Sequence, residues 1–174
     1  MACNQTLKGI ARDCANALGG VEEVLIANFS DVTAKTLTDN VISAITLATG
    51  AYFHLYSFRP QTAEAVSTLN KSSENGTAFV TTELTMQFHK QDTAKRIEIK
   101  ALVSGELVVI YKDNNGKYWL MGNERPVEAT AGPGNSGKAF GDFNGYGITL
   151  QANESDYPIE VSSAIISSLL PPAA

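Results

Sequence analysis

The chain has 174 residues, of which 44% are hydrophobic and 18% are charged, and its formal net charge is -5. This length suits one domain, so residues 1–174 are expected to fold as a single unit. An acidic chain without a basic block is a poor candidate for tight nucleic-acid binding, which depends on neutralising phosphates. The charged share is below the ~25% typical of soluble domains, which suggests that partners cover part of the surface.

Membrane insertion and secretion are not expected. The longest unbroken apolar run, residues 107–111, is far shorter than the ~20 residues that a membrane-spanning helix needs. The first residues lack the basic and apolar regions of a secretory signal, which favours a cytoplasmic protein. Its two cysteines, Cys3 and Cys14, are then expected to stay reduced.

The apolar positions of residues 6–18 recur at three- and four-residue spacing, which is typical of one face of a helix. Gly19 and Gly20 would end this helix. The sequence therefore predicts an N-terminal helical segment within residues 1–20.

Mostly strands are expected after this segment. Runs of apolar, β-branched and aromatic residues bounded by turn residues predict them. The expected strands are residues 24–29, 52–58, 62–69, 80–89, 107–111, 117–121 and 148–150. The remaining expectations are polar turns over 30–40, a glycine-rich loop over 131–147, a last apolar element over 159–170 and a flexible tail at 171–174.

The longest expected hairpin turns at Asn75 and Gly76, which tolerate the positive φ angles of a tight turn. In the strand after this turn, apolar and polar residues alternate, so one face should be buried and the other polar. The apolar face carries Val80, Thr82, Leu84, Met86 and Phe88. The polar face carries the candidate assembly or lumen residues Thr81, Glu83, Thr85 and Gln87, followed by His89.

Asp92 or Thr93 is expected to cap a helix that runs to about Val103 and ends at Gly105. A second hairpin is expected to turn over residues 113–116. Together these elements predict a mainly β fold, a β-sandwich or open barrel with one or two flanking α-helices and a long hairpin.

Residues 132–138 match the glycine and Gly-Lys positions of a phosphate-binding loop. That loop needs Ser or Thr after the lysine to bind magnesium, and Ala139 stands there. It also needs a helix directly afterwards, which residues 140–145 cannot begin. We therefore expect a loop between strands and no nucleotide cofactor.

Other catalytic and metal-binding patterns are weak. His54 and His89 show no spacing to a nucleophile and carboxylate that would indicate a triad. Cys3 and Cys14 have no nearby histidine for a zinc site, and Lys117 stands where a calcium loop over 113–116 would need an oxygen ligand. A carboxylate pair for glycoside chemistry stays open, because spacing in sequence does not give spacing in space. We expect no enzyme, no cofactor and no metal.

Aromatic residues cluster in two places. The clusters are Tyr52, Phe53, Tyr56 and Phe58, and then Tyr118 and Trp119. Such rings can form a platform for a ligand, although packing in a core or interface is the commoner use. A monomeric β-sandwich module that binds a glycan through Trp119 and its neighbouring tyrosines is therefore one alternative.

The segment from Val108 to Gly122 is similar to part of the virion structural proteins of tailed phages, particularly those that infect Bacteroidetes-type hosts. Residues 75–77, 92–98 and 141–146 fit the same pattern. The resemblance covers most of residues 1–165 and consists of turn and strand motifs.

The order of elements also resembles the phage tail-tube fold, with residues 62–89 as its long hairpin and Asp92 to Val103 as its flanking helix. The resemblance implies a homo-oligomer of hexameric rings that stack into a conduit for double-stranded DNA, without catalytic residues. Its implied partners are further copies and other tail or neck proteins, and its place is the virion after synthesis in the host cytoplasm. A collar, connector or tail-terminator ring is the alternative, since such proteins share this fold.

Overall fold

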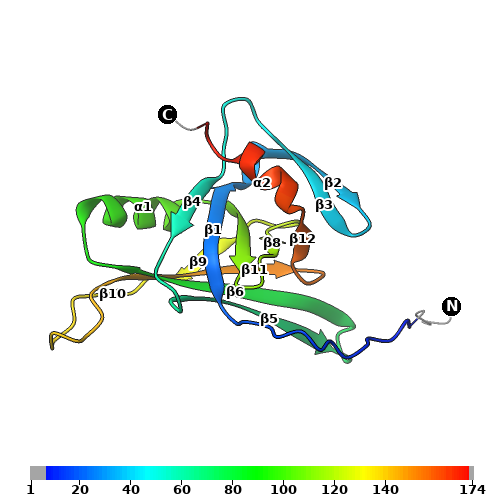
Figure 1. The fold of residues 1–174 in the computed structure, drawn as a ribbon, viewed down its shortest axis with the longest axis horizontal. Coiled ribbons are helices and arrows are strands. Elements are labelled where there is room, and N and C mark those ends of the chain that lie inside the picture. Colours follow the sequence, from blue (N-terminus) through cyan, green and yellow to red (C-terminus); the bar gives the residue numbers. More distant parts are fainter. Residues whose placement is uncertain (1–6, 173–174) are drawn as a thin grey trace.

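The structure is a computed structural model that describes residues 7–172. Its strands form two stacked sheets, with one helix at the end of the stack and a second over the outer side of the larger sheet (Figure 1). The strands are β1 (Val21–Asn28), β2 (Val32–Thr38), β3 (Val41–Leu47), β4 (His54–Ser57), β5 (Ala63–Ser72), β6 (Thr77–His89), β7 (Leu107–Asp113), β8 (Tyr118–Met121), β9 (Glu128–Ala131), β10 (Gly134–Asn135), β11 (Gly145–Glu154) and β12 (Ile159–Val161). The helices are α1 (Thr93–Ser104), α2 (Ser163–Leu169) and the short 3-10 turn η1 (Phe29–Asp31).

The larger sheet has seven strands in the order β2-β3-β12-β8-β7-β1-β4. The smaller sheet has five strands, in the order β10-β11-β6-β5 with β9 also paired to β11. Neither sheet closes into a barrel within the described residues. The mainly β prediction with flanking helices and a long hairpin is therefore confirmed.

Apolar residues fill two cores, one on each side of the seven-stranded sheet. The core between the two sheets includes Val24, Ile26, Leu84, Met86, Val109, Ile148 and Leu150. The core on the opposite side includes Leu25, Ile42, Phe53, Ile110, Leu120, Ile166 and Leu169. Because the middle of β1 and the first part of β7 face both cores, residues 24–27 and 107–111 are unbroken apolar runs rather than alternating ones.

The long hairpin is confirmed as β5 and β6, which pair from Ala63↔Met86 to Ser72↔Thr77. Gly76 has the expected positive φ of 63°, but Asn75 does not, because Ser72 pairs with Thr77 and the turn is a four-residue loop over 73–76 instead of a two-residue one. The helix after it is also confirmed, because the Asp92 side chain accepts hydrogen bonds from the N–H groups of Ala94 and Lys95. The expected second hairpin is the pair β7–β8.

The predicted N-terminal helix is wrong over the described part of its range. Residues 7–20 contain no helix and are exposed throughout, whereas residues 1–6 lie outside the described chain. An isolated helix of about 12 residues is marginal in water unless its apolar side packs on something. Here that side meets no surface, and Gly9 adopts φ of 73° in the middle of the segment.

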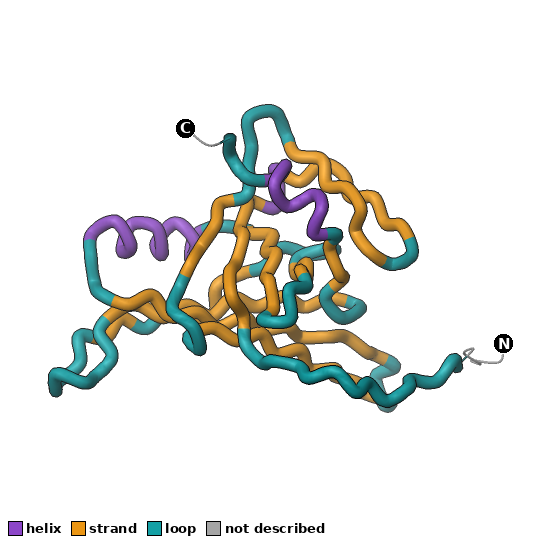
Figure 2. The backbone as a smooth tube through the Cα atoms, in the orientation of Figure 1, coloured by secondary structure: helices purple, strands orange, loops and turns teal. Residues whose placement is uncertain are grey.

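Two predicted loops contain strands. The prediction of turns over residues 30–40 is wrong, because β2 pairs along β3 at the edge of the larger sheet. The expected loop over 131–147 contains the two-residue strand β10, and its ends belong to β9 and β11. Figure 2 shows the rest of this segment as a projecting loop. Edge strands of polar sequence gain their backbone hydrogen bonds from a neighbour, so their own residues give little signal. Of the expected tail, Pro171 and Pro172 have no regular structure and residues 173–174 lie outside the described chain.

Candidate functional site

The predicted assembly residues lie together on one surface. Thr81, Glu83, Thr85 and Gln87 point away from the core, because the residues between them on β6 are buried. The strands on both sides of β6 add residues at matching positions of the register. We call this surface the outer face, and its members are Thr81, Glu83, Thr85 and Gln87 of β6, Glu64, Val66 and Thr68 of β5, Thr149, Gln151 and Asn153 of β11, and Glu128 and Thr130 of β9.

Hydrogen bonds between side chains cross the strands of the outer face. The Thr81 hydroxyl donates to Asn153 Oδ1 at 2.8 Å and accepts from Asn70 Nδ2 at 3.0 Å. The hydroxyls of Thr85 and Thr149 lie 3.3 Å apart. These contacts tie β5, β6 and β11 together on the polar side, so the face is an ordered surface rather than a set of loose side chains.

The charge of the outer face is acidic. It carries the carboxylates of Glu64, Glu83 and Glu128 and, among the residues that define it, no lysine or arginine. Arg125 lies at its margin, just before β9. A surface of this kind repels a phosphate backbone instead of gripping it.

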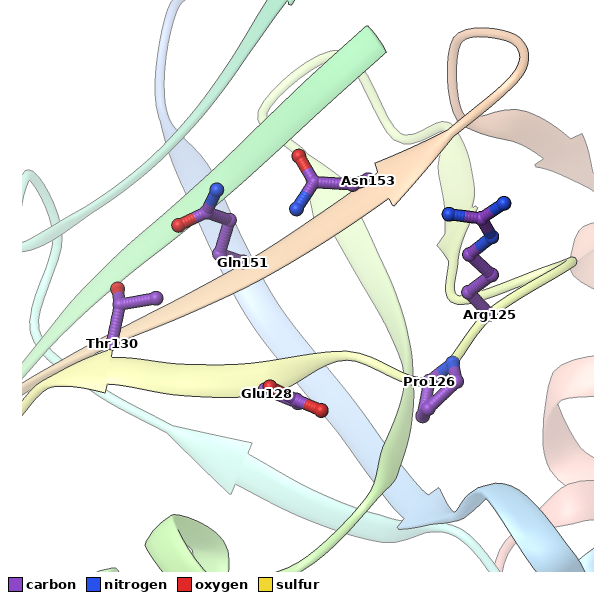
Figure 3. Close-up of a pocket in the computed structure, with 6 residues that line it drawn as sticks. All are labelled: Arg125, Pro126, Glu128, Thr130, Gln151 and Asn153. Atoms are coloured by element: carbon purple, nitrogen blue, oxygen red, sulfur yellow. The ribbon is translucent and has the colours of Figure 1, made fainter. Parts of the chain in front are cut away.

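The outer face contains a hollow of about 330 Å³ near its β9 edge. Figure 3 shows Gln151 and Asn153 projecting from β11, Thr130 and Glu128 on β9, and Arg125 and Pro126 in the segment that leads into β9. These side chains offer amide, hydroxyl, carboxylate and guanidinium groups for hydrogen bonds. Only one of the six lining residues is a carboxylate, and none is a histidine. The hollow can hold a polar group, but it lacks the pair of carboxylates that glycoside hydrolysis needs.

The free edge of the smaller sheet is β5. This strand has ten residues and pairs only with β6, so one of its two edges is open along its length. Val66 and Leu69 on this strand are about half exposed. Natural proteins usually shorten, charge or cover such an edge, because it is a template for pairing with another chain.

The other sequence motifs do not converge on a site. His54 is exposed on β4 of the larger sheet, whereas His89 ends β6 of the smaller sheet and packs edge-on against Phe143. In the phosphate-loop match, the N–H groups of Lys138 and Ala139 donate to the Asp142 carboxylate at 2.8 and 2.7 Å. No group of three metal-ligating side chains occurs among residues 7–172.

The aromatic residues do not form an exposed platform. Trp119 packs against the core between the sheets, and its indole N–H donates to Asp113 Oδ2 at 3.1 Å. Phe53 is fully buried, and the Tyr118 hydroxyl donates to Glu23 at 3.2 Å. The rings chosen for a glycan platform are thus used mainly in packing.

The part of the outer face that lies on β9 and β11 is not among the residues that the sequence predicts for it. Glu128, Gln151 and Asn153 belong to strands that were not expected or were expected to be shorter. A signal was present in β11, where Gln151 and Asn153 alternate with Leu150 and Ala152.

The comparisons with known proteins gave no relative. No protein-family model, curated protein or solved structure matches this chain. None of the helices in residues 7–172 is both long and apolar enough to cross a membrane.

Proposed function

We propose that this chain is a structural protein whose copies assemble side by side into rings or a tube, with the outer face toward a central channel. We further propose that this assembly is the tail conduit of a phage virion, through which double-stranded DNA passes. The observation that carries the proposal is the open edge of β5 beside an ordered, acidic and polar face.

The open edge supports assembly. Alternate residues of an outer strand direct their backbone N–H and C=O groups away from the sheet, and β5 presents them over ten residues. On the other side of the same sheet, β9 and β10 are short and leave part of β11 uncovered. Two unlike edges on one subunit suit a head-to-tail contact, which closes into a ring when the rotation between copies allows it.

The outer face supports a conduit. Glu64, Glu83 and Glu128 repeat in every copy, so a ring would surround its channel with negative charge. DNA moves through such a channel without being held, because tight binding requires cations that neutralise its phosphates.

The alternatives differ in what the assembly does. A collar, connector or tail terminator would form a single ring, whereas a tube would stack rings. A monomeric glycan-binding module is the second candidate, favoured by the polar lining of the 330 Å³ hollow. It requires a chain that stays monomeric and binds sugar.

The test compares two sets of lysine substitutions. Thr81→Lys, Thr85→Lys and Gln87→Lys together place cations on the outer face, and Thr36→Lys, Thr46→Lys and Thr49→Lys add the same charge at exposed positions of the larger sheet and its loops. Both proteins should fold by circular dichroism, since neither set touches a buried residue. Only the outer-face set should weaken rings seen by negative-stain microscopy, or make tubes that retain DNA at low salt and release it at high salt. Equal behaviour of the two sets would contradict the proposed orientation of the outer face.

A further inference from the structure

Residues 7–20 form an extended arm, the N-terminal arm, whose apolar side chains are uncovered. Leu7 is 90% exposed and Ile10 is 102% exposed. Together with Cys14 and Leu18 they recur at the spacing of one helix side. In an extended chain these side chains would be mixed with Lys8, Arg12 and Asp13, but in a helix they form one apolar stripe. The arm thus carries apolar side chains that its own domain leaves in water, and only a helix would gather them on one side.

The base of the arm is fixed to the body. The N–H of Leu18 donates to Asn115 Oδ1 at 2.8 Å, and Asn115 Nδ2 donates to the Leu18 carbonyl at 3.0 Å. Asn114 Nδ2 donates to the Gly19 carbonyl at 2.6 Å. These bonds set the direction in which the arm leaves the body. In Figure 1 its N-terminal end and helix α1 lie at opposite ends of the long axis.

A groove lies at the α1 end, mainly apolar in its larger part and of mixed polarity in its smaller part. Two adjoining hollows of about 180 and 150 Å³ make up this groove between α1 and β4, and they share Tyr56, Glu98 and Leu102 in their linings. The hydrogen bond from the Tyr56 hydroxyl to Glu98 joins the two walls. We call this groove the α1 groove. Its other apolar members include Ile26, Leu55, Phe88, Ile99 and Leu107. An apolar cavity of about 150 Å³ accommodates a benzene-sized group, so each hollow has room for one aliphatic side chain.

We propose that the N-terminal arm of one copy docks in the α1 groove of a second copy, as a short helix that inserts Leu7 and Ile10. The arm and helix α1 lie at opposite ends of the molecule, so the arm and the groove beside α1 are two different surfaces, as a head-to-tail contact between copies requires. The direction set by Asn114 and Asn115 carries the arm away from the groove of its own copy. Docking supplies the apolar contact without which so short a helix does not form.

The charges of the two surfaces are compatible with this contact. The arm carries Lys8 and Arg12 against Asp13, on a chain that is otherwise acidic. On the groove wall, Glu98 Oε1 accepts a hydrogen bond from the Tyr56 hydroxyl. The other carboxylate oxygen of Glu98 would pair with a cation of the arm. Lys95 at the end of the groove is already engaged, because its ammonium donates to the carbonyls of His89 and Lys90 at 2.7 and 3.3 Å.

Disulfide cross-linking in the full chain tests the contact, with the natural Cys14 as reporter and Cys3→Ser in all variants. Ala101→Cys places a thiol on the exposed wall of the groove, and Ser167→Cys on the exposed side of α2 is the matched control. One protein keeps Cys14 alone, and its partner carries Cys14→Ser with one of the new cysteines, so that any mixed disulfide joins two copies. We expect several-fold more mixed dimer with Ala101→Cys than with Ser167→Cys under mild oxidation, and its loss when Ile10→Asp is added to the Cys14 partner.

Two results would overturn the inference. One is equal cross-linking of the groove and control cysteines. The other is a disulfide within one copy when Cys14 and Ala101→Cys share a chain, with no mixed dimer between chains. The inference does not depend on the outer face lining a channel. If the mixed dimer forms but no ring or tube is seen, the proposed function is contradicted and the arm contact is supported. If rings form without the mixed dimer, the proposed function is supported and the arm contact is contradicted.

Discussion

The carboxylate of Glu154 accepts a hydrogen bond from the backbone N–H of Gly122 at 3.2 Å. The same carboxylate accepts the N–H groups of Asn123 and Glu124. Glu124 in turn accepts the N–H of Ser155 at 3.2 Å. The end of β11 and the segment after β8 therefore hold each other through two glutamates. This clasp fixes the chain that leads into β9 and supports the hollow of the outer face.

Removing the Glu154 carboxylate should destabilise the protein. Glu154 is buried, and Glu154→Ala leaves its backbone donors without a partner, at a cost of about 2–3 kcal/mol. Glu154→Gln keeps an acceptor of the same shape and should cost less. Urea unfolding of the three proteins measures this order. A Glu154→Ala protein as stable as the unmodified one would show that the hydrogen bonds to the Glu154 carboxylate do not stabilise the fold.

Lys35 joins the same region, because its ammonium donates to the Asn123 carbonyl at 2.7 Å. Burial lowers the pKa of Lys35, and the nearby Glu154 charge opposes that shift. Lys35→Met should therefore cost less than Glu154→Ala, since a half-buried ammonium already loses part of its hydration. The same urea experiment compares the two variants, and a larger loss for Lys35→Met would contradict this ranking.

Asp113 should contribute to stability in a pH-dependent way. Burial acts to raise the pKa of Asp113, but hydrogen bonds from the Lys117 backbone, the Trp119 indole and Asn115 outweigh it and hold this pKa below its ordinary value. A carboxyl group with a lowered folded-state pKa stabilises the protein above its unfolded pKa, about 3.9 for Asp, and loses that contribution as the pH falls through the folded value.

The measurement compares the unmodified protein with Asp113→Asn between pH 7 and pH 2.5. The difference in the free energy of unfolding should be constant near neutral pH and shrink in acid. A difference that stays constant throughout would show that the Asp113 charge does not matter. Fluorescence reports the same site, because Trp119 is the sole tryptophan of the chain.

Trp119→Ala should destabilise the fold by about 2–3 kcal/mol, below the 3–5 kcal/mol found for fully buried aromatic residues. The smaller cost follows from the partial exposure of Trp119, which packs against the core without being fully buried. Trp119→Phe keeps most of the packing and removes the bond to Asp113, so it is the matched control. A loss below about 1 kcal/mol for Trp119→Ala would indicate a ring that is free for a ligand.

The phosphate-loop match should bind no nucleotide. The N–H groups of Lys138 and Ala139, which would face a phosphate in such a loop, donate to the Asp142 carboxylate instead. Lys138→Ala should therefore leave stability and assembly unchanged. Calorimetric titration with magnesium ATP checks this. Saturable binding that Lys138→Ala abolishes would contradict it.

Local patterns predicted the parts of the fold that depend on local chemistry. Asn75 and Gly76 marked the turn of the long hairpin, Asp92 marked the start of α1, and the alternation through Leu84 and Met86 gave the buried face of β6. The same alternation explains why the polar residues between them point away from the core. These signals depend on residues that are near one another in the chain.

Elements that depend on distant partners were not predictable in this way. Strand β2 is polar, and its pairing with β3 is what makes it a strand. Strand β9 reaches the outer face only because β11 provides its hydrogen bonds. For the N-terminal arm, the local pattern predicted an element that the structure lacks. Its spacing indicates a helix, but within one copy nothing covers its apolar side chains. The arm's sequence pattern and its structure agree only if a partner supplies that cover.

The most direct test of the central claim is the mass of the purified, unmodified protein by multi-angle light scattering over a wide range of concentration, with negative-stain images of the same samples. If the copies assemble as proposed, the masses are whole multiples of the 18.5 kDa chain and grow with concentration, and the images show closed rings or stacked rings. A mass that remains that of one chain at the highest concentration, with no rings in the images, would contradict the claim that this chain is an assembly subunit.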